Sequence, residues 1–161
     1  MPNGFSFKML VGSTPMYRTN ATAIQAQLAE VGITAELEVT ETVKVLQQVV
    51  ARTYQASSTI WIGLNADPDF VLHPLYHSQG LFNKERYRNA KVDELLDRGR
   101  TLDRQDDRRK LYGEAVTGIV DDAADLWLYH PDVTAAMSKK VRGVPLSADG
   151  RVRLRGAWIE K

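Results

Sequence analysis

Cysteine is absent from the 161 residues, so the sequence has no disulfide framework, no thiolate metal site and no cysteine nucleophile. An excess of charge is also absent, because 21 Lys and Arg stand against 20 Asp and Glu and the net charge is +1. A basic patch that predicts binding to nucleic acid or to an anionic membrane is therefore not expected. The lack of cysteine does not identify the compartment, since many secreted and periplasmic proteins also lack it.

The N-terminus lacks the charged region and apolar run of a signal peptide, because Met-Pro-Asn-Gly leads directly into a strand-like segment. We therefore expect either a cytoplasmic protein or a segment of a longer chain. Apolar residues make up 43% and charged residues 25%, which is typical of a globular domain. The length is sufficient for one domain with a buried core.

The first third of the sequence alternates between strand and helix periods. Residues 5–11 and 33–40 alternate apolar and polar side chains, which predicts two strands. The helix between them is expected to begin at Thr19 or Asn20 and to end at Gly32. A second helix and a third strand (54–62) follow. Thr42 is a candidate N-cap for this helix, which is expected to face inward with Val43, Leu46, Val49 and Val50. This β-α-β-α-β order favours a sheet covered by helices.

The second part of the sequence predicts helices followed by short strands. Asn89 is a candidate N-cap for a helix that buries Val92, Leu95 and Leu96. A longer helix is expected at 106–123, with its inward side chains at Leu111, Tyr112, Ala115, Val116, Ile119 and Val120. Strand-like segments then occur at 126–129, 133–137 and 152–159. The whole pattern predicts a compact α/β lobe.

Asp67 and Asp69 flank Pro68 directly after the third predicted strand. In an enzyme they could be paired carboxylates, one protonated and one ionised, and a cation site rich in oxygen ligands is also conceivable. The simpler interpretation is a turn, because Asp-Pro favours turn initiation and an aspartate side chain caps the backbone that follows. We favour the turn.

His73 and His77 are four residues apart and share one face if the segment is helical, as metal-binding pairs do. However, no third ligand stands at a diagnostic spacing, and the glutamate of a His-Glu-x-x-His motif is missing. We therefore predict no metal site, with one histidine exposed and the other hydrogen-bonded within the lobe. The sequence also has no Gly-x-Ser-x-Gly motif and no glycine-rich phosphate loop.

Trp61 ends a predicted strand and precedes a glycine and a turn, so it is well placed to present a flat apolar face at the mouth of a cleft. Burial in the core is the alternative. Near the C-terminus, Arg151, Arg153 and Arg155 alternate along the last predicted strand. This spacing indicates an amphipathic edge strand more than a stripe that binds phosphate or RNA.

The segment 61–69, Trp-Ile-Gly-Leu-Asn-Ala-Asp-Pro-Asp, resembles the Trp-x-Gly-Asp-Tyr-Pro-Asp-Pro-Asp segment of the family 5 extracellular solute-binding proteins. These proteins are the peptide, nickel, glutathione and related receptors of ATP-binding-cassette (ABC) importers. Further landmarks of the family follow in order: Asn83 with residues 87–96, then Asp103, Arg108, Leu111 and Tyr112, and finally 141–144 and 154–158. Residues 28–39 also resemble the family's "L-x-x-x-G-I-x-V-x-L".

The resemblance implies an α/β fold, namely a type II periplasmic binding protein-like lobe with a mixed sheet flanked by helices. Members of the family bind a small solute between two lobes and deliver it to an ABC permease, without catalysis or cofactor. They are about three times this length, so residues 1–140 resemble the distal ligand-binding lobe and 141–161 a return segment toward a missing first lobe. The implied location is periplasmic or extracellular, with membrane contact only through the permease or a lipid anchor on the missing N-terminal part, and without nucleic acid as a partner.

One residue departs from the family pattern. In peptide-binding members, an aspartate in the segment after the tryptophan pairs with the free amino group of the ligand, and Leu64 takes its place here. Because leucine cannot compensate a buried ammonium, a simple peptide held in that manner is not expected. The predicted ligand-binding residues are Trp61, Leu64 and Asn65, with Asp67 and Asp69 shaping the loop.

The residues leave two alternatives of other classes. One is a small stand-alone α/β hydrolase or metal-assisted enzyme that uses Asp67, Asp69 and His73. The other is a structural or interaction module, which predicts an exposed apolar patch where a partner binds.

Overall fold

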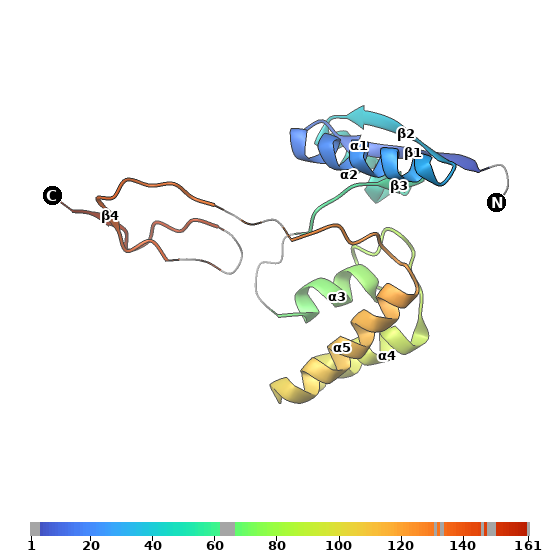
Figure 1. Ribbon diagram of the computed structural model, residues 1–161. Coiled ribbons are helices and arrows are strands. Elements are labelled where there is room, and N and C mark those ends of the chain that lie inside the picture. Colours follow the sequence, from blue (N-terminus) through green and yellow to red (C-terminus); the bar gives the residue numbers. More distant parts are fainter. Residues whose placement is uncertain are drawn as a thin grey trace. The chain divides into compact units, whose positions relative to one another are not determined.

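The computed structural model describes residues 4–61, 67–130, 132, 134–145, 147 and 151–160. They belong to two compact units, and the division between the units lies after Trp61 (Figure 1). The first unit is α/β, and the second consists of three helices followed by a short pair of strands. Each unit has a hydrophobic core of its own.

The first unit is a three-stranded parallel sheet with two crossover helices. Its elements are β1 (Phe5–Gly12), α1 (Pro15–Glu30), β2 (Ile33–Thr40), α2 (Thr42–Ala51) and β3 (Ala56–Ser57). The strand order is β2-β1-β3, and β1 pairs with β2 from Phe5 opposite Ile33 to Gly12 opposite Thr40. Parallel neighbours need crossover connections, and the two helices supply them. The predicted β-α-β-α-β order is confirmed, but the third strand is limited to Ala56–Ser57 of the predicted 54–62, so Trp61 does not end a strand.

The side chains of β1 alternate between the two faces of the sheet. Met9 and Val11 pack with Ala21 of α1, whereas Leu10 packs with Val45 and Val49 of α2. All of these residues are buried, so β1 is covered on both sides. This burial explains why β1 is the central strand of the sheet.

The start of α1 differs from the prediction, because the helix begins at Pro15 with Thr14 as its N-cap, not at Thr19 or Asn20. Proline is favourable in the first turn, since its missing N–H is unpaired there in any residue. Gly32 follows the helix with φ of 79°, the left-handed conformation in which glycine has no Cβ penalty. The predicted end of the helix is confirmed.

The inward face of α2 was predicted correctly only at Val49. Val45 and Val49 are buried, whereas Val43, Leu46 and Val50 are exposed. The apolar side chains of this ten-residue helix lie on several of its sides, so the periodicity alone does not identify the face that meets the sheet. The N-cap is Glu41, one residue before the predicted Thr42.

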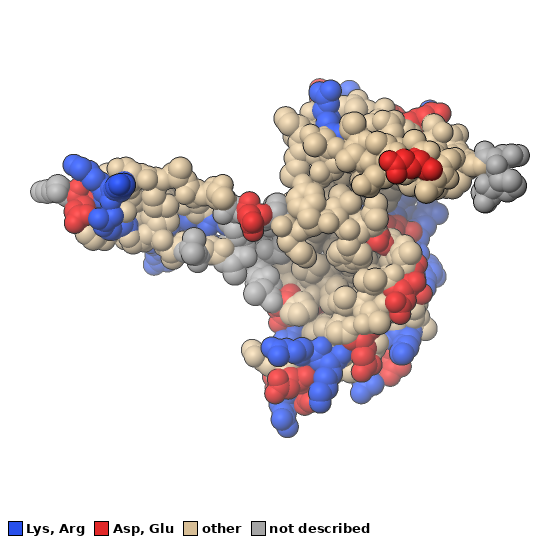
Figure 2. All heavy atoms as spheres, viewed as in Figure 1, with Lys and Arg blue, Asp and Glu red and all other residues tan. Residues whose placement is uncertain are grey.

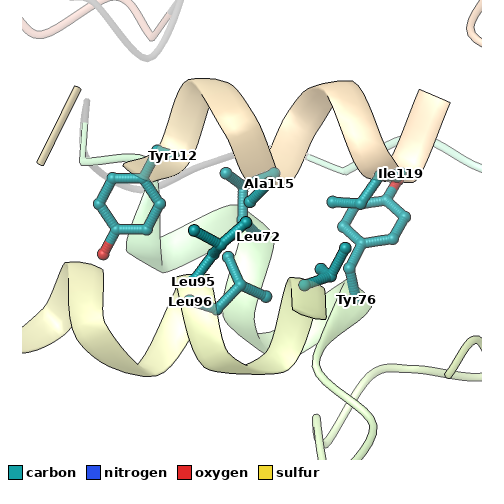
Figure 3. Packing of buried hydrophobic residues seen from close by; sticks show 8 residues of the cluster. Leu72, Tyr76, Leu95, Leu96, Tyr112, Ala115 and Ile119 are labelled. Atoms are coloured by element: carbon teal, nitrogen blue, oxygen red, sulfur yellow. The ribbon is translucent and has the colours of Figure 1, made fainter. Parts of the chain in front are cut away.

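The second unit is built on α3 (Asp69–Tyr76), α4 (Ala90–Thr101) and α5 (Gln105–Asp121). Figure 3 shows the side chains of these three helices meeting in one core. The buried residues of this core are Leu72, Tyr76, Val92, Leu95, Leu96, Tyr112, Ala115 and Ile119. The prediction for the α4 residues is confirmed. On α5, Tyr112, Ala115 and Ile119 are buried as expected, but Val116 and Val120 are exposed.

Asn89 caps α4, as predicted from the sequence. Its Oδ1 accepts hydrogen bonds from the backbone N–H groups of Lys91 at 3.0 Å and Val92 at 3.3 Å. We expect Asn89→Ala to lower the free energy of unfolding by about 1 kcal/mol, because two N–H groups lose their acceptor. Urea denaturation followed by circular dichroism measures the change. Asn89→Ser retains an acceptor for the N–H groups but, like alanine, loses the hydrogen bond from Nδ2 to Asp122. It should therefore be more stable than Asn89→Ala, and equal losses for both variants would contradict the capping role.

The strands predicted near the C-terminus are largely wrong for the described residues. Residues 126–129 and 134–137 form no ladder, and pairing is limited to β4 (Val141–Arg142) with β5 (Trp158–Ile159), which are antiparallel. A strand requires a hydrogen-bonding partner, which an apolar alternating sequence does not supply by itself. Residues 151–155 lie outside any strand, so the edge-strand interpretation of the three arginines is also wrong.

The surface of the helical unit carries both signs of charge side by side (Figure 2), as the mixed sequence at 103–110 predicts. Within the described residues, no helix is both long enough and apolar enough to cross a membrane.

Candidate ligand-binding site

The predicted site residues fall in three places along the chain. Trp61 is the last described residue of the first unit, and its side chain is 37% exposed. Leu64 and Asn65 lie outside the described residues. Asp67 and Asp69 belong to the second unit, directly before and at the start of α3. Contact of these five residues with a solute stays a prediction, and the geometry of the two aspartates can be described in detail.

Asp67 is held at the start of α3 by an arginine from α5. The guanidinium of Arg108 donates from Nη1 to Oδ2 at 2.9 Å and from Nη2 to Oδ1 at 2.7 Å. The backbone N–H of Asp69 also donates to Oδ1 of Asp67 at 2.9 Å. The aspartate therefore caps the backbone that follows it, which is the turn role predicted from the sequence. The bidentate pairing with arginine fixes the direction of the side chain as well as its position.

The arginine also determines the charge state of this carboxyl group. Its hydrogen bonds hold the pKa of Asp67 below the usual range, and the backbone hydrogen bond from Asp69 lowers the pKa further. The same pairing raises the pKa of Arg108. The guanidinium lies 5.3 Å from the centre of the Tyr112 ring, and its Nε donates to the carbonyl of Gly99 at 3.1 Å. Arg108 thus joins α4, α5 and the start of α3.

Asp69 is engaged by the same two helices. Its Oδ1 accepts a hydrogen bond from the Tyr112 hydroxyl at 3.4 Å and lies 3.3 Å from Nε of Arg100 on α4. Both aspartates are therefore ion-paired within the second unit, as expected of side chains that shape the loop. The lowered pKa of Asp67 makes its carboxyl group a poor candidate for the proton donor that the hydrolase alternative requires.

The pairing of Asp67 with Arg108 predicts a specific pH dependence of stability. Because the folded-state pKa of Asp67 is lowered, its contribution is present above the unfolded pKa of about 3.9 and is lost as pH falls through the folded pKa. We expect the difference in unfolding free energy between the wild type and Asp67→Asn to be largest near pH 6 and to shrink below pH 4. Denaturant unfolding across this range measures the difference.

The matched control for this experiment removes the cation. In an Arg108→Met background, Asp67→Asn should have a much smaller effect at every pH, since the pair acts as a unit. A difference between wild type and Asp67→Asn that stays constant down to pH 2 would contradict the pairing.

Sequence reasoning did not assign Arg108 or Arg100 to the site. Arg108 and Tyr112 were noted only as landmarks of a helix, although their spacing of four residues places them on one face of α5. Nothing local in the sequence shows that this face meets residues 67–69. Arg108 and Asp67 are 41 positions apart in the sequence, and only the tertiary structure brings them into contact.

The described residues also form two open hollows. One, of about 290 Å³, lies on the first unit, and Lys8, Glu38 and Arg52 contribute charges of both signs to it. The other, of about 210 Å³, lies between α4 and α5 near Asn89 and Glu114. Both volumes lie below the usual range of about 300–1,000 Å³ for ligand pockets, and neither hollow contains a predicted site residue.

Residues 2–83 match the family model described as bacterial extracellular solute-binding proteins, family 5 Middle. The match covers just over half of the chain and includes all five predicted site residues. It also spans the whole first unit and α3 of the second.

Three curated relatives match most of the chain. The probable di/tripeptide-binding protein 5 of Pseudomonas aeruginosa is 31% identical over 134 residues, which are 81% of this chain and 26% of the relative. The probable D,D-dipeptide-binding periplasmic protein of Escherichia coli is 30% identical over 132 residues, 80% of this chain and 26% of the relative. Heme-binding protein A of Haemophilus influenzae is 28% identical over 166 residues, which cover 99% of this chain and 30% of the relative.

Solved structures show the same fold. A periplasmic binding protein from Helicobacter pylori in complex with the peptide STSA superposes with a TM-score of 0.78 at 25% identity, covering 99% of this chain and 32% of that one. The Haemophilus influenzae protein bound to the peptide RPPGFSPFR superposes with a TM-score of 0.80 at 17% identity, covering 99% of this chain and 32% of that one. These neighbours are type II periplasmic binding proteins, which confirms the predicted fold class.

This chain spans between about a quarter and a third of the length of these relatives. The relatives are binding proteins rather than enzymes, and the motif order found in the sequence is that of their family. The match over half of the chain confirms the resemblance: the chain belongs to the family 5 bacterial extracellular solute-binding proteins.

Proposed function

We propose that this chain forms the distal lobe of an extracytoplasmic receptor, which captures a small peptide-like solute and delivers it to the permease of an ABC importer. The observation that carries the proposal is the family match over residues 2–83. The names of two relatives specify dipeptides or tripeptides, and one of these relatives is named periplasmic. A receptor of this kind binds its solute without chemical change.

The proposed division of the chain is the one that the resemblance to the family implies. Residues 1–140 form the distal ligand-binding lobe, and residues 141–161 form the return segment toward a first lobe. The short β4–β5 ladder lies within this return segment, with Arg142 and Glu160 paired at 2.6 Å. The division between the two compact units, after Trp61, lies within the proposed lobe and does not coincide with its boundary at residue 140.

Solute binding in this proposal requires closure of two lobes around the ligand. Trp61, Leu64 and Asn65 line the wall from this lobe, and apolar and aromatic surfaces supply most of the contact area. Asp67 and Asp69 support the wall, since their carboxylates already pair with arginines of α4 and α5. Without a carboxylate at Leu64, a free ammonium of the solute must find its partner elsewhere in the receptor.

The proposal is tested with a chimaeric receptor. The part of this chain that matches the Pseudomonas di/tripeptide-binding protein, over 134 residues, replaces its counterpart in that protein. Binding of dipeptides and tripeptides is then measured by isothermal titration calorimetry. We expect the chimaera to bind at least one peptide with a Kd in the micromolar range or below, and Trp61→Ala to weaken it by about tenfold or more. The conservative control Trp61→Phe should retain most of the affinity, because it keeps a flat aromatic ring.

A folded chimaera that binds no peptide of the set would contradict the peptide-like solute. An equal loss for Trp61→Ala and Trp61→Phe, or no loss for either, would remove Trp61 from the site. The isolated chain should bind the same peptides weakly, since it supplies only part of the contacts.

A further inference from the structure

His73 of α3 and His77, the residue directly after this helix, face an aspartate of α4. The rings of His73 and His77 stack with their centres 4.4 Å apart and their planes 9° from parallel. Oδ1 of Asp97 lies 3.5 Å from Nε2 of each ring. One ligand atom from each of the three residues lies within 4.8 Å of the others. The third ligand that the sequence spacing did not provide is thus supplied across the α3–α4 contact.

We propose that His73, His77 and Asp97 bind one divalent transition-metal ion of the zinc, nickel or copper class. Imidazole suits these ions, and two histidines with one carboxylate are a common donor set that leaves a further position for water. A spacing of four residues places both rings on one helical face. None of these three side chains is a predicted residue of the solute site, and Arg100 is the side chain that contacts both His73 and Asp69.

The accessibility of the three side chains is compatible with ion entry. His77 and His73 are only 9% and 19% exposed, whereas Asp97 is 62% exposed. Ligand atoms around tetrahedral zinc lie about 3.3 Å apart, given metal–ligand distances of about 2.0–2.1 Å. Oδ1 of Asp97 already lies 3.5 Å from each Nε2, so the adjustment required on binding is mainly a tilt of the two stacked imidazoles toward one ion.

His73 already has the tautomer that a metal requires. Its Nε2 lies 3.0 Å from Nη1 of Arg100, and because a guanidinium only donates, Nε2 carries the lone pair. A bound ion would take over this lone pair. Arg100 would keep its second partner, Asp69, at 3.3 Å. Arg100 is therefore a competitor for the ligand atom and a like charge close to the ion.

His77 must change its tautomer on binding. Its Nδ1 accepts a hydrogen bond from the backbone N–H of Gln79 at 3.1 Å, so the ring proton is on Nε2, the nitrogen next to Asp97. Coordination through Nε2 moves this proton to Nδ1 and breaks the contact with Gln79. Because binding displaces two existing hydrogen bonds, we expect a Kd in the micromolar range and not tighter.

The rest of the sequence offers little competition for such an ion. The chain has three histidines and no cysteine, so His130 is the remaining imidazole. Untagged protein, treated with EDTA and then dialysed, is titrated with ZnCl₂ and with NiCl₂ in a calorimeter. We expect saturable binding of one ion per chain.

Variants of His73 and Asp97 carry the test. His73→Ala and Asp97→Asn should each weaken binding by about tenfold or more, while far-UV circular dichroism stays unchanged. Arg100→Gln should tighten binding severalfold, because it removes both the competing donor and the positive charge. Arg98→Gln is the matched control, since Arg98 lies on the same helix but pairs with Glu94, and it should bind as the wild type does.

The absence of saturable binding, or wild-type affinity in His73→Ala and Asp97→Asn, would overturn the proposal. Affinity of Arg100→Gln equal to or weaker than that of the wild type would overturn the ligand geometry. If these residues had only a structural role, their substitution would change the melting temperature by the same amount with and without added metal.

Discussion

Leu96→Ala is expected to lower the free energy of unfolding of the helical unit by about 2–5 kcal/mol. Leu96 has no exposed surface and lies in the core where α3, α4 and α5 meet (Figure 3). Truncation removes apolar contacts and leaves a cavity that three packed helices cannot fully close. Urea denaturation followed by far-UV circular dichroism measures the loss, at equal protein concentration for both proteins.

Leu81→Ala is the matched control, because the same atoms are removed from a side chain that is 75% exposed. Leu81→Ala should change the free energy of unfolding by no more than about 0.5 kcal/mol. Similar losses for the two variants would contradict the position of Leu96 in the core.

Asn83→Ala is expected to have the second-largest effect, with a loss of about 1–3 kcal/mol. Asn83 is 3% exposed, and its amide holds the loop between α3 and α4. Nδ2 donates to the carbonyls of His77 at 3.1 Å and Tyr87 at 2.8 Å, and Oδ1 accepts from the N–H of Tyr87 at 2.9 Å. The alanine variant leaves three backbone groups without this partner, and chemical denaturation measures the loss.

Asn83→Asp separates this hydrogen-bond role from simple packing. An ionised carboxylate at this position would face two carbonyl oxygens and could no longer donate, so its folded-state pKa should be raised. The variant should therefore be less stable than Asn83→Ala at pH 7 and should gain stability relative to it as pH falls toward 4. A difference between the two variants that does not change with pH would contradict the donor role of the amide.

The elements that could be predicted from sequence are those determined by local chemistry. The alternation of β1 and β2, the left-handed Gly32 and the capping by Asn89 depend on neighbours a few residues away. The cap formed by Asp67 is equally local, since it involves its own turn. Such signals depend on a short stretch of backbone and require no knowledge of the fold.

The errors concern contacts that only the tertiary structure determines. The face of α2 was ambiguous because apolar residues surround the helix, and Val45 was not included among its inward residues. Residues 126–129 have a strand-like composition but no ladder partner within the described residues. The pairing of Arg108 with Asp67, and of Asp97 with the two histidines, joins residues of different elements. No spacing in the sequence encodes these pairs.

The most direct test of the central claim is the stabilisation of the chimaeric receptor by peptide. At a concentration of about 100 times Kd, a solute that binds only the folded state should raise the unfolding free energy by about 2.7 kcal/mol. We predict this shift for the chimaera with a dipeptide or tripeptide, and no comparable shift for the isolated chain. A chimaera that melts at the same temperature with every peptide, or an isolated chain that is stabilised as strongly, would contradict the assignment of this chain as one lobe of a solute receptor.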